Sequence, residues 1–500
     1  ELHAADTLAV GCGLSEPFVV DSITRDGPDA VRWLISAGMR LDRGPDGRLA
    51  MGREGGHRVP RVVHTQGTAS GEELQRTLVL LARGHPKLDL FPHVAGVDLA
   101  FDGQGAVAGL LALMSPGPGR EERAVLFEAR AVIFATGGAG QTYRETTNPP
   151  AATGDGLAMA LRAGAELQDL EFVQFHPTIL YLAGAARFLI SEVTRGAGGT
   201  LRDRQGRAFM REYHPDGELG PRDVVSRAIF RQMIKTGDTH VYLDLTAVPD
   251  VISLFPTLAR ITAEFGIDIR RDRIPVRPAV HYFVGGIAGD LSGRTTLEGL
   301  WAAGECSSTG FHGANRMGSN SLLEGLVHGR RVGREAAGSL GAATRRLVPL
   351  HPAPPRHVSG AELSLSDMTY SLKALLWRQV GIEREEAGLQ DALGRLQEWE
   401  GYLARLGPFN RSGVEVVNMV QVGQVVSFSA LFRKESRGTH YRKVHPEADP
   451  AWRVHTRLCF RKGGLEIRTL PAGEPAASPP DSGASTLPAD TGSARRPRIS

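Results

Sequence analysis

The stretch RAVIFATGGAG at residues 130–140 decides the fold. Its apolar run predicts a buried β-strand, which the paired glycines Gly137 and Gly138 end. In open α/β sheets, ligands bind outside the carboxyl ends of such strands. Glycine is also abundant in the whole chain, with 61 of 500 residues, which is typical of backbone that approaches a ligand closely. The sequence therefore predicts an α/β domain with a ligand site where this strand ends.

The periodicity of apolar residues extends this interpretation in both directions. It predicts strands at residues 88–91, 96–101, 106–114 and 123–138, and helices at residues 28–38, 71–84, 153–164 and 221–237. Strands and helices mix between residues 171 and 280, and the glycine-rich α/β pattern returns after residue 281. This interruption predicts a second domain inserted into the first one.

The predicted domain organisation has six segments. An α/β domain occupies 1–170 and returns at 281–340, an α+β domain is inserted at 171–280, a linker spans 341–365, a helical domain spans 366–445, and the tail is 446–500. The proline in the linker (HPAPPRH) breaks regular structure. The end of the tail is rich in Pro, Ala and Ser, and we expect the whole of 446–500 to be of low complexity and disordered.

Composition excludes several classes of function. The chain has 58 Lys and Arg against 55 Asp and Glu, for a formal net charge of +3, which argues against a nucleic-acid or anionic-membrane module. Its three cysteines are too few and too scattered for a disulfide framework or a zinc cluster, so we expect no metal. We see no apolar run of the ~20 residues that a spanning helix needs, and no signal peptide.

Histidines and arginines stand at strand ends and loops in four glycine-rich or proline-containing stretches. They are His176 in EFVQFHPT, Arg222 in PRDVV, His281 in PAVHYFVGGI, and Arg316, with His312, in GFHGANRMGSNSLLEG. Taken singly, each is more often a structural histidine or a surface arginine. Taken together, they predict a cationic pocket for a small dicarboxylate, because the guanidinium fork matches carboxylates.

Four further groups have both a functional and a structural interpretation. Glu54 in REGGH is either a turn residue or, if it faces the pocket, the partner of a substrate ammonium, which would make the substrate an acidic amino acid. The helix start at Ser321 is either an ordinary cap or an amide cluster that stabilises negative charge on a reduced flavin. Asp155 in TGDG and Glu305 in GLWAAGE are either plain structural acids or cofactor contacts.

Read together, these segments resemble the flavoprotein family that includes L-aspartate oxidase and the flavoprotein subunits of succinate dehydrogenase and fumarate reductase. The similarity covers roughly residues 6 to 445, and the REGGH form resembles the aspartate-oxidase branch. The matching stretches are EGGH, ATGG with TTNP, GDGLAMA, EFVQFHPT, PRDVV, HYFVGGI, GLWAAGE, HGANRMGSNSLLE and RKESRGTHYR.

The resemblance implies an α/β FAD-binding domain with non-covalent FAD, an inserted α+β capping domain and a C-terminal helical domain. It implies the oxidation of L-aspartate to iminoaspartate with O₂ or fumarate as acceptor. This is the first step of NAD biosynthesis in the cytoplasm, and the product passes to quinolinate synthase. The alternative is a succinate dehydrogenase or fumarate reductase type of flavoprotein.

The resemblance also assigns residues to the site. It places His176, Ser191, Arg222, His281 and Arg316 on dicarboxylate-binding and catalytic positions, with Arg222 as the proton shuttle of fumarate chemistry. Glu54 falls on the position that orients the substrate amine. The flavin-contacting positions are Asp155, Glu305, Ser321, Leu322, Gly137 and Gly138.

One feature of the family is not found at the start of this sequence. Members open with a strand and a G-x-G-x-x-G turn that cradles the FAD pyrophosphate. GCGLSE at residues 11–16 echoes this turn only superficially, because no apolar strand precedes it. We therefore expect a FAD-binding domain truncated at its N-terminus, with an inactive truncated relative as a further alternative.

Overall fold

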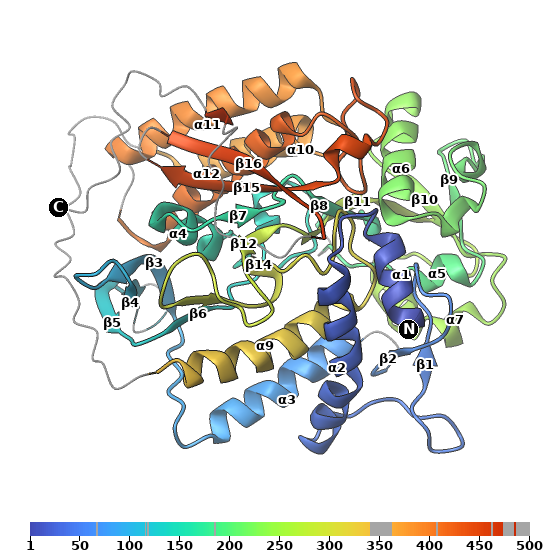
Figure 1. Cartoon of the computed structure of the whole chain (residues 1–500). Helices are drawn as coiled ribbons and strands as arrows, with labels where there is room; N and C mark the ends of the chain where they lie inside the picture. The colour runs from blue at the N-terminus through green and yellow to red at the C-terminus, as the bar shows by residue number, and fades with distance from the viewer. Residues whose placement is uncertain are drawn as a thin grey trace.

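The computed structural model describes residues 1–500 apart from 67–68, 116, 118–119, 185–186, 341–362, 407–408, 462–463, 474–484 and 487–500. The α-helices in these parts (Figure 1) are α1 Leu2–Val10, α2 Pro17–Ser36, α3 Ser70–Gly84, α4 Asp155–Ala163, α5 Val193–Gly196, α6 Arg222–Thr236, α7 Val251–Leu254, α8 Pro256–Ala263, α9 Asn320–Gly338, α10 Leu365–Gln379, α11 Glu386–Leu406 and α12 Arg411–Phe432. The strands are β1 Met51–Gly52, β2 Val62–Val63, β3 Val94–Phe101, β4 Val107–Met114, β5 Arg123–Glu128, β6 Val132–Phe134, β7 Leu167–Gln168, β8 Val173–Leu180, β9 Thr200–Arg202, β10 Val241–Asp244, β11 Ile274–Phe283, β12 Gly286–Ala288, β13 Leu300–Ala302, β14 Ser307–Ser308, β15 Val454–Arg461, β16 Gly464–Pro471 and β17 Ser485–Thr486.

The α/β part brings together segments that are far apart in sequence. Strand β6 pairs in parallel with β13, so the glycines after β6 and the GECS segment after β13 meet at one edge. Strands β3, β4 and β5 form an antiparallel sheet beside this pair. The predicted strand at 88–91 is wrong, because this segment forms no ladder in the structure.

Helices α2 and α9 cover one side of the α/β part. Val19, Val20 and Ile23 of α2 pack against Phe311 and Val327 in a buried cluster. Helix α2 begins eleven residues earlier than the predicted start at residue 28, because Pro17 opens it and Pro28 lies within it without ending it. GCGLSE, residues 11–16, connects α1 to α2, so a helix precedes this loop where a dinucleotide turn would follow a strand.

The inserted region contains a four-stranded antiparallel sheet in the order β8-β11-β10-β9. Helix α6 packs on it, with Val225 and Ile229 in a core that also contains Leu243 and Val276. Pro221 caps α6 instead of occupying its first turn, and Gly237 ends the helix with a φ of 67°, a left-handed conformation that glycine adopts without strain. Figure 1 shows this region (green) to one side of the α/β part.

The C-terminal region contains α10, α11 and α12. Within the predicted helical domain at 366–445, α10 and α11 are separate helices, because the chain turns at Gly381, where a Cβ would lie 2.4 Å from the carbonyl oxygen of Trp377. Among the described residues, α12 is long and apolar enough to cross a membrane, with a mean hydropathy of 1.3 in its most apolar window. However, 78% of that window is buried inside the protein, as in the core helix of many globular folds.

The prediction of a disordered tail from residue 446 is wrong for its first part. Strands β15 and β16 form an antiparallel hairpin, and β15 extends a sheet through β7. Alternating apolar residues such as Leu458 and Ile467 are buried in this hairpin. The prediction missed this alternation because the composition of the later tail was applied to the whole segment. Most of the predicted linker, at 341–362, and most of the tail beyond residue 473 lie outside the described residues.

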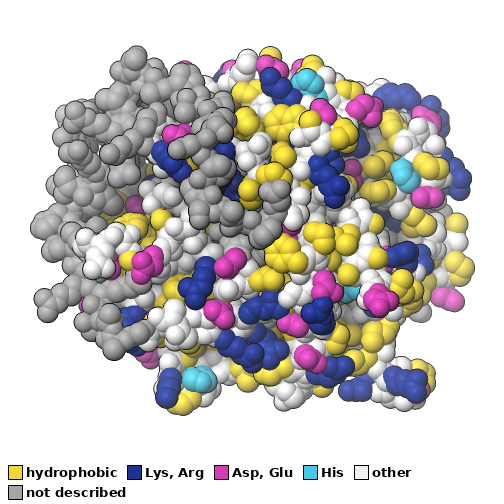
Figure 2. Space-filling view, viewed as in Figure 1, with side chains coloured by type: hydrophobic (Ala, Val, Ile, Leu, Met, Phe, Trp, Pro, Cys, Tyr) yellow, Lys and Arg dark blue, Asp and Glu magenta, His cyan; other side chains and the backbone are white. Residues whose placement is uncertain are grey.

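Figure 2 shows acidic and basic side chains intermixed on the described part of one face, in agreement with the near-neutral charge balance. Charged groups are also buried deep inside. The Arg433 guanidinium, which begins RKESRG, donates to Glu171 at 2.6 Å and to Glu435 at 2.9 Å. Farther along the same motif, Thr439 donates its backbone N–H to the Ala314 carbonyl at 3.0 Å. The C-terminal motif therefore braces the loop that carries Arg316.

A buried histidine connects three segments of the chain. The Nδ1 atom of His455 lies 2.5 Å from Asp169, and its Nε2 atom lies 3.0 Å from Glu16. Burial alone would lower the pKa of His455, but the two carboxylates outweigh it and raise the pKa from 6.5 to about 9. The imidazolium stabilises the folded state fully below pH 6.5, and this contribution is lost as the pH rises through about 9.

We expect the His455→Gln variant to be less stable than the wild type by an amount that depends on pH. The difference in the free energy of unfolding is expected to be largest at pH 6 and to shrink by about 3 kcal/mol toward pH 10. Denaturant titrations at a series of pH values measure it. The exposed His85 provides the control variant His85→Gln, which should show no such trend. A difference between wild type and His455→Gln that stays constant with pH would contradict the assignment of a charged imidazole.

Candidate active site

Two histidines on neighbouring strands form one wall of the site. His176 lies on β8 and His281 on β11, and their ring centroids are 5.5 Å apart. The Nδ1 atom of His176 accepts the backbone N–H of Thr178 at 3.3 Å, which leaves Nε2 as the protonated donor. The Nδ1 atom of His281 lies 3.0 Å from the Thr147 hydroxyl. The structure therefore brings together two histidines that are about a hundred residues apart.

Both histidines are held neutral. Burial lowers the pKa of His176 and of His281 well below 6.5, and the neighbouring guanidinium groups of Arg222 and Arg316 lower both values further. The positive charge of the predicted cationic pocket therefore comes from Arg222 and Arg316. In this site the arginines carry the charge, and the histidines act as hydrogen-bond donors.

Arg222 and Arg316 converge on one buried amide. The Gln174 side-chain oxygen accepts from Arg222 at 3.4 Å and from Arg316 at 3.2 Å. The Arg316 guanidinium also lies 4.9 Å from the centre of the Tyr282 ring. Burial, followed by repulsion from Arg222, lowers the pKa of Arg316 to about 10. The two guanidinium groups repel each other, so an anion that binds between them is strongly stabilised.

Sequence reasoning missed three residues of this cluster. Gln174 lies two positions before His176, so that the period of two in a strand places both side chains on one side of β8. Glu192 accepts from the Arg222 Nε at 2.6 Å and from Arg195 at 3.0 Å. These arginines outweigh burial and keep the pKa of Glu192 low, while Glu192 outweighs burial and raises the pKa of Arg222. The acid and the base in FLISEVTRG, three positions apart in the order Glu–x–x–Arg, were the available signal.

Glu54 faces the two arginines. A Cβ added at Gly318 would lie 2.4 Å from a carboxylate oxygen of Glu54 and 3.3 Å from a guanidinium nitrogen of Arg222. The Glu54 carboxylate also acts electrostatically on both Arg222 and Arg316. The next residue, Gly55, donates its N–H to Glu192 at 3.1 Å. The Glu54 carboxylate is therefore turned toward the two arginines, which with the two histidines form a cluster that we call the clamp. The amine-binding interpretation of Glu54 requires this orientation.

Ser191 lies beside this cluster without a described hydrogen bond to its arginines. Its hydroxyl accepts from the backbone N–H of Val193 at 3.4 Å. Ser191 also lines a cavity of about 210 Å³ between the inserted domain and Gln66. The proposed contact of Ser191 with a substrate carboxylate therefore stays a prediction.

The edge formed by β6 and β13 has room for a cofactor. Gly137, with φ 72°, and Gly304, with φ 71°, both face open space, because a Cβ at either position would meet no atom within 4 Å. Gly138 packs against Glu305, whose carboxylate lies 2.2 Å from where a Cβ would be. Burial raises the pKa of Glu305 to about 7, and its carboxylate accepts from the N–H of Phe283 at 3.0 Å. This glycine cradle with a buried acid fits a ligand rich in hydroxyl groups, such as the ribityl chain of a flavin.

The start of α9 connects this cradle to the clamp. Its N-cap, Ser319, makes no side-chain capping bond, so the first amides of the helix have no partner within the helix. Ser321 accepts from Arg316 at 3.0 Å, and Leu322 is 47% exposed. These features fit the predicted flavin contacts. In contrast, the Asp155 carboxylate accepts from Thr153 at 3.0 Å and from Asn418 at 2.8 Å, which gives it a structural partner in the helical domain.

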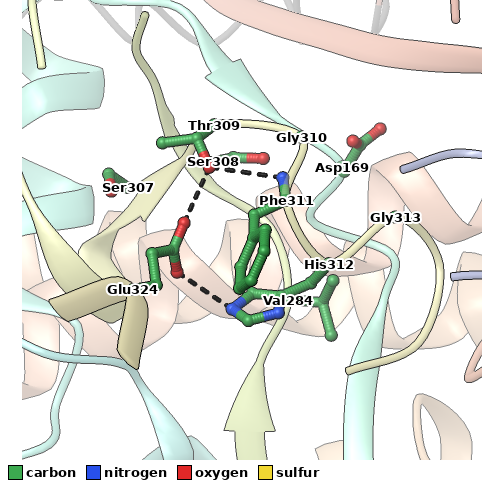
Figure 3. Close-up of a pocket in the computed structure, with 10 residues that line it drawn as sticks. All are labelled: Asp169, Val284, Ser307, Ser308, Thr309, Gly310, Phe311, His312, Gly313 and Glu324. Atoms are coloured by element: carbon green, nitrogen blue, oxygen red, sulfur yellow. Dashed lines mark hydrogen bonds and ion pairs between the residues drawn. The ribbon is translucent and has the colours of Figure 1, made fainter. Parts of the chain in front are cut away.

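A small pocket lies beside the same helix (Figure 3). Glu324 joins the Thr309 hydroxyl at 2.7 Å and the His312 Nε2 at 2.9 Å, as the dashed lines show. The Nδ1 atom of His312 is buried and has no partner within the described structure. A polar group of a ligand bound in this pocket could form a hydrogen bond with this nitrogen. Within the described residues, the acidic, histidine and cysteine side chains form no group that could hold a metal ion.

Comparison with known families and proteins agrees with this geometry. Residues 1–322 match the family described as "FAD binding domain", and residues 369–473 match "Fumarate reductase flavoprotein C-term". The L-aspartate oxidase of Mycobacterium tuberculosis is 43% identical over 89% of this chain and 82% of its own length. That of Streptomyces coelicolor is 40% identical over 91% of this chain and 81% of its own length.

Solved structures show the same fold. The quinol fumarate reductase of E. coli superimposes with a TM-score of 0.83 at 30% identity, over 96% of this chain and 88% of that one. The Sdh1 complex of Mycobacterium smegmatis gives a TM-score of 0.78 at 32% identity, over 95% of this chain and 84% of that one. The architecture is therefore that of a FAD-binding domain followed by a C-terminal helical domain.

Proposed function

From the premise that this chain belongs to the family of L-aspartate oxidases and fumarate reductase flavoproteins, we propose how its side chains bind and oxidise the substrate. The protein is an L-aspartate oxidase, a flavoenzyme with non-covalent FAD that converts L-aspartate to iminoaspartate. This activity implies a role in NAD biosynthesis. We also propose that it works in the cytoplasm with O₂ or fumarate as acceptor, and that quinolinate synthase consumes its product.

The arrangement of charges around the clamp carries this proposal. Arg316, with His281 and His176 as neutral donors, binds the two carboxylates of the substrate, and Ser191 contributes a hydroxyl. Glu54 accepts the substrate ammonium and holds it beside two arginines that would otherwise repel it. A plain diacid such as succinate has no group that would use Glu54. An amino diacid satisfies every charge in the cluster.

The residues at the β6–β13 edge hold the cofactor in this proposal. Gly137, Gly138 and Glu305 would hold the hydroxyl-bearing chain of the cofactor, and the first amides of α9, with Ser321 and Leu322, would contact its flavin part. When bound, FAD supplies the two-electron acceptor for the oxidation. The positive charge of Arg316 and the start of α9 favour the anionic, reduced form of this group.

Arg222, Glu192 and Arg195 form a chain of charged hydrogen bonds. We propose that this chain moves protons between the site and the surface when the enzyme reduces fumarate, with Arg222 as the donor to the substrate carbon. Because Glu192 raises the pKa of Arg222, Arg222 cannot serve as the base that deprotonates the aspartate ammonium. In the oxidative direction, its role is to hold charge beside the substrate.

The experiment that tests the function uses the purified full chain with FAD under anaerobic conditions. We expect L-aspartate to bleach the visible absorption of the oxidised flavin and to release ammonia as the imine hydrolyses. Succinate should bleach it far more slowly. Equal or faster reduction by succinate would favour the succinate dehydrogenase type, and a chain that retains no flavin would be the inactive relative.

A further inference from the structure

His57, the last residue of REGGH, connects the loop of Glu54 to the segment of Arg316. It is 5% exposed. Its Nε2 atom lies 3.0 Å from the carbonyl oxygen of Gly318, two residues after Arg316. Its backbone N–H donates to the carbonyl of Glu54 at 3.1 Å. One side chain therefore bridges the ammonium-binding loop and the carboxylate-binding segment.

The hydrogen bonds of His57 fix its tautomer. The Arg61 guanidinium lies 3.0 Å from the Nδ1 atom of His57, and a guanidinium can only donate. The Nδ1 atom must therefore accept, so that Nε2 carries the proton and donates to Gly318. Burial, together with the charge of Arg61, lowers the pKa of His57, which favours this neutral form.

Arg61 is itself held in place. Its second amino group donates to the buried carboxylate of Asp6 at 2.7 Å. Asp6 lies on α1 and also pairs with Arg58, whose side chain is 59% exposed. The chain Asp6, Arg61, His57 and Gly318 thus runs from α1 to the entrance of α9.

Glu54 and Gly318 are tightly packed against each other. A Cβ at Gly318 would overlap the Glu54 carboxylate, and a Cβ at Gly56 would lie 2.9 Å from Val10 and 3.1 Å from Met317. A shift of the 318 peptide would therefore move Glu54 relative to Arg316. The bond from His57 opposes this shift.

We propose that His57 is a positioning residue that sets the separation between the ammonium site at Glu54 and the carboxylate site at Arg316, and thereby selects amino diacids over plain diacids. This inference rests on the proposed aspartate chemistry, since fumarate has no ammonium for Glu54 to hold. Loss of the bridge disturbs aspartate recognition and leaves the carboxylate clamp in place.

The test compares two substitutions in the FAD-loaded enzyme. In His57→Leu, kcat/KM for L-aspartate oxidation is expected to fall about tenfold or more relative to that for fumarate reduction, mainly through KM, because a misplaced binding group loses orientation. His57→Gln keeps an amide donor for the Gly318 carbonyl and should restore most of the ratio. Succinate binding, which reports on the carboxylate clamp, is measured as the rise in melting temperature on adding succinate. This rise should be equal in the wild type, His57→Leu and His57→Gln.

Two arginines supply a matched control, because both side chains pair with Asp6 and, of the two, the Arg61 guanidinium bonds to the His57 ring. Arg61→Ala should lower the aspartate-to-fumarate ratio, and Arg58→Ala should not. If His57→Leu does not fold, the arginine pair decides the question. Equal losses of both activities, or an unchanged ratio, would overturn the inference. A wild type that reduces fumarate without oxidising aspartate would overturn the proposed function instead.

Discussion

The Glu54→Gln variant is expected to lose aspartate oxidation by about a hundredfold or more in kcat/KM, the usual effect of removing one partner from a close charge pair. Without the carboxylate, the substrate ammonium would lie beside Arg222 and Arg316 with nothing to offset their charge. Steady-state oxidation with O₂, and fumarate reduction by the same preparation, measure the effect.

Fumarate reduction serves as the internal comparison for this variant. Because fumarate carries no ammonium, its kcat/KM should change little in Glu54→Gln. The exposed Glu72 on α3 gives a matched control, Glu72→Gln, which should leave both activities intact. If Glu54→Gln lowers both activities alike, the assignment of this chain to aspartate chemistry is wrong.

The Arg316→Lys variant is expected to lose both activities by about a thousandfold, since lysine keeps the charge but cannot form the planar fork that binds a carboxylate. It also loses the donor bonds to Gln174 and Ser321 and the stacking on Tyr282. We expect kcat to fall and KM to rise, because the same group holds the substrate and sets its orientation.

Flavin content and melting temperature separate a folding defect from a binding defect in this variant. Arg48, whose side chain is 88% exposed, gives the control Arg48→Lys, which should behave as the wild type. An Arg316→Lys protein that keeps its flavin and retains activity within about tenfold would contradict a role for the fork.

Much of this cluster could be predicted because its residues stand in short motifs that contain glycine or proline. His176, His281, Arg222 and Arg316 come from four separate segments, and the structure places His176 beside His281 and joins both arginines through Gln174. The expectation that they stand at strand ends and loops holds only in part, because His176 lies in the middle of β8 and Arg316 lies in the loop before α9. The residues alone left two interpretations of Glu54 open, because a loop gives no periodicity from which to infer the direction of a side chain, and only the family resemblance favoured the amine-binding one.

Other features of the site and fold could be identified only from the three-dimensional arrangement. Burial decides that His176 and His281 are neutral, and burial cannot be read from residue type. Gln174 and Glu192 were missed because their short sequence spacings point to the site only when Arg222 is placed beside both of them. Strands β15 and β16 were missed because their short alternation stands next to a proline- and serine-rich tail.

The brace between Thr439 and Ala314 has a consequence for how the enzyme is made. The loop before Arg316 rests on a residue synthesised more than a hundred positions later, so a nascent polypeptide emerging from the ribosome lacks this support for most of its translation. The support for the loop that carries Arg316 is therefore completed late in synthesis. A chain that terminates between residues 316 and 439 would have all the side chains of the proposed clamp and would lack the hydrogen bond that braces its loop.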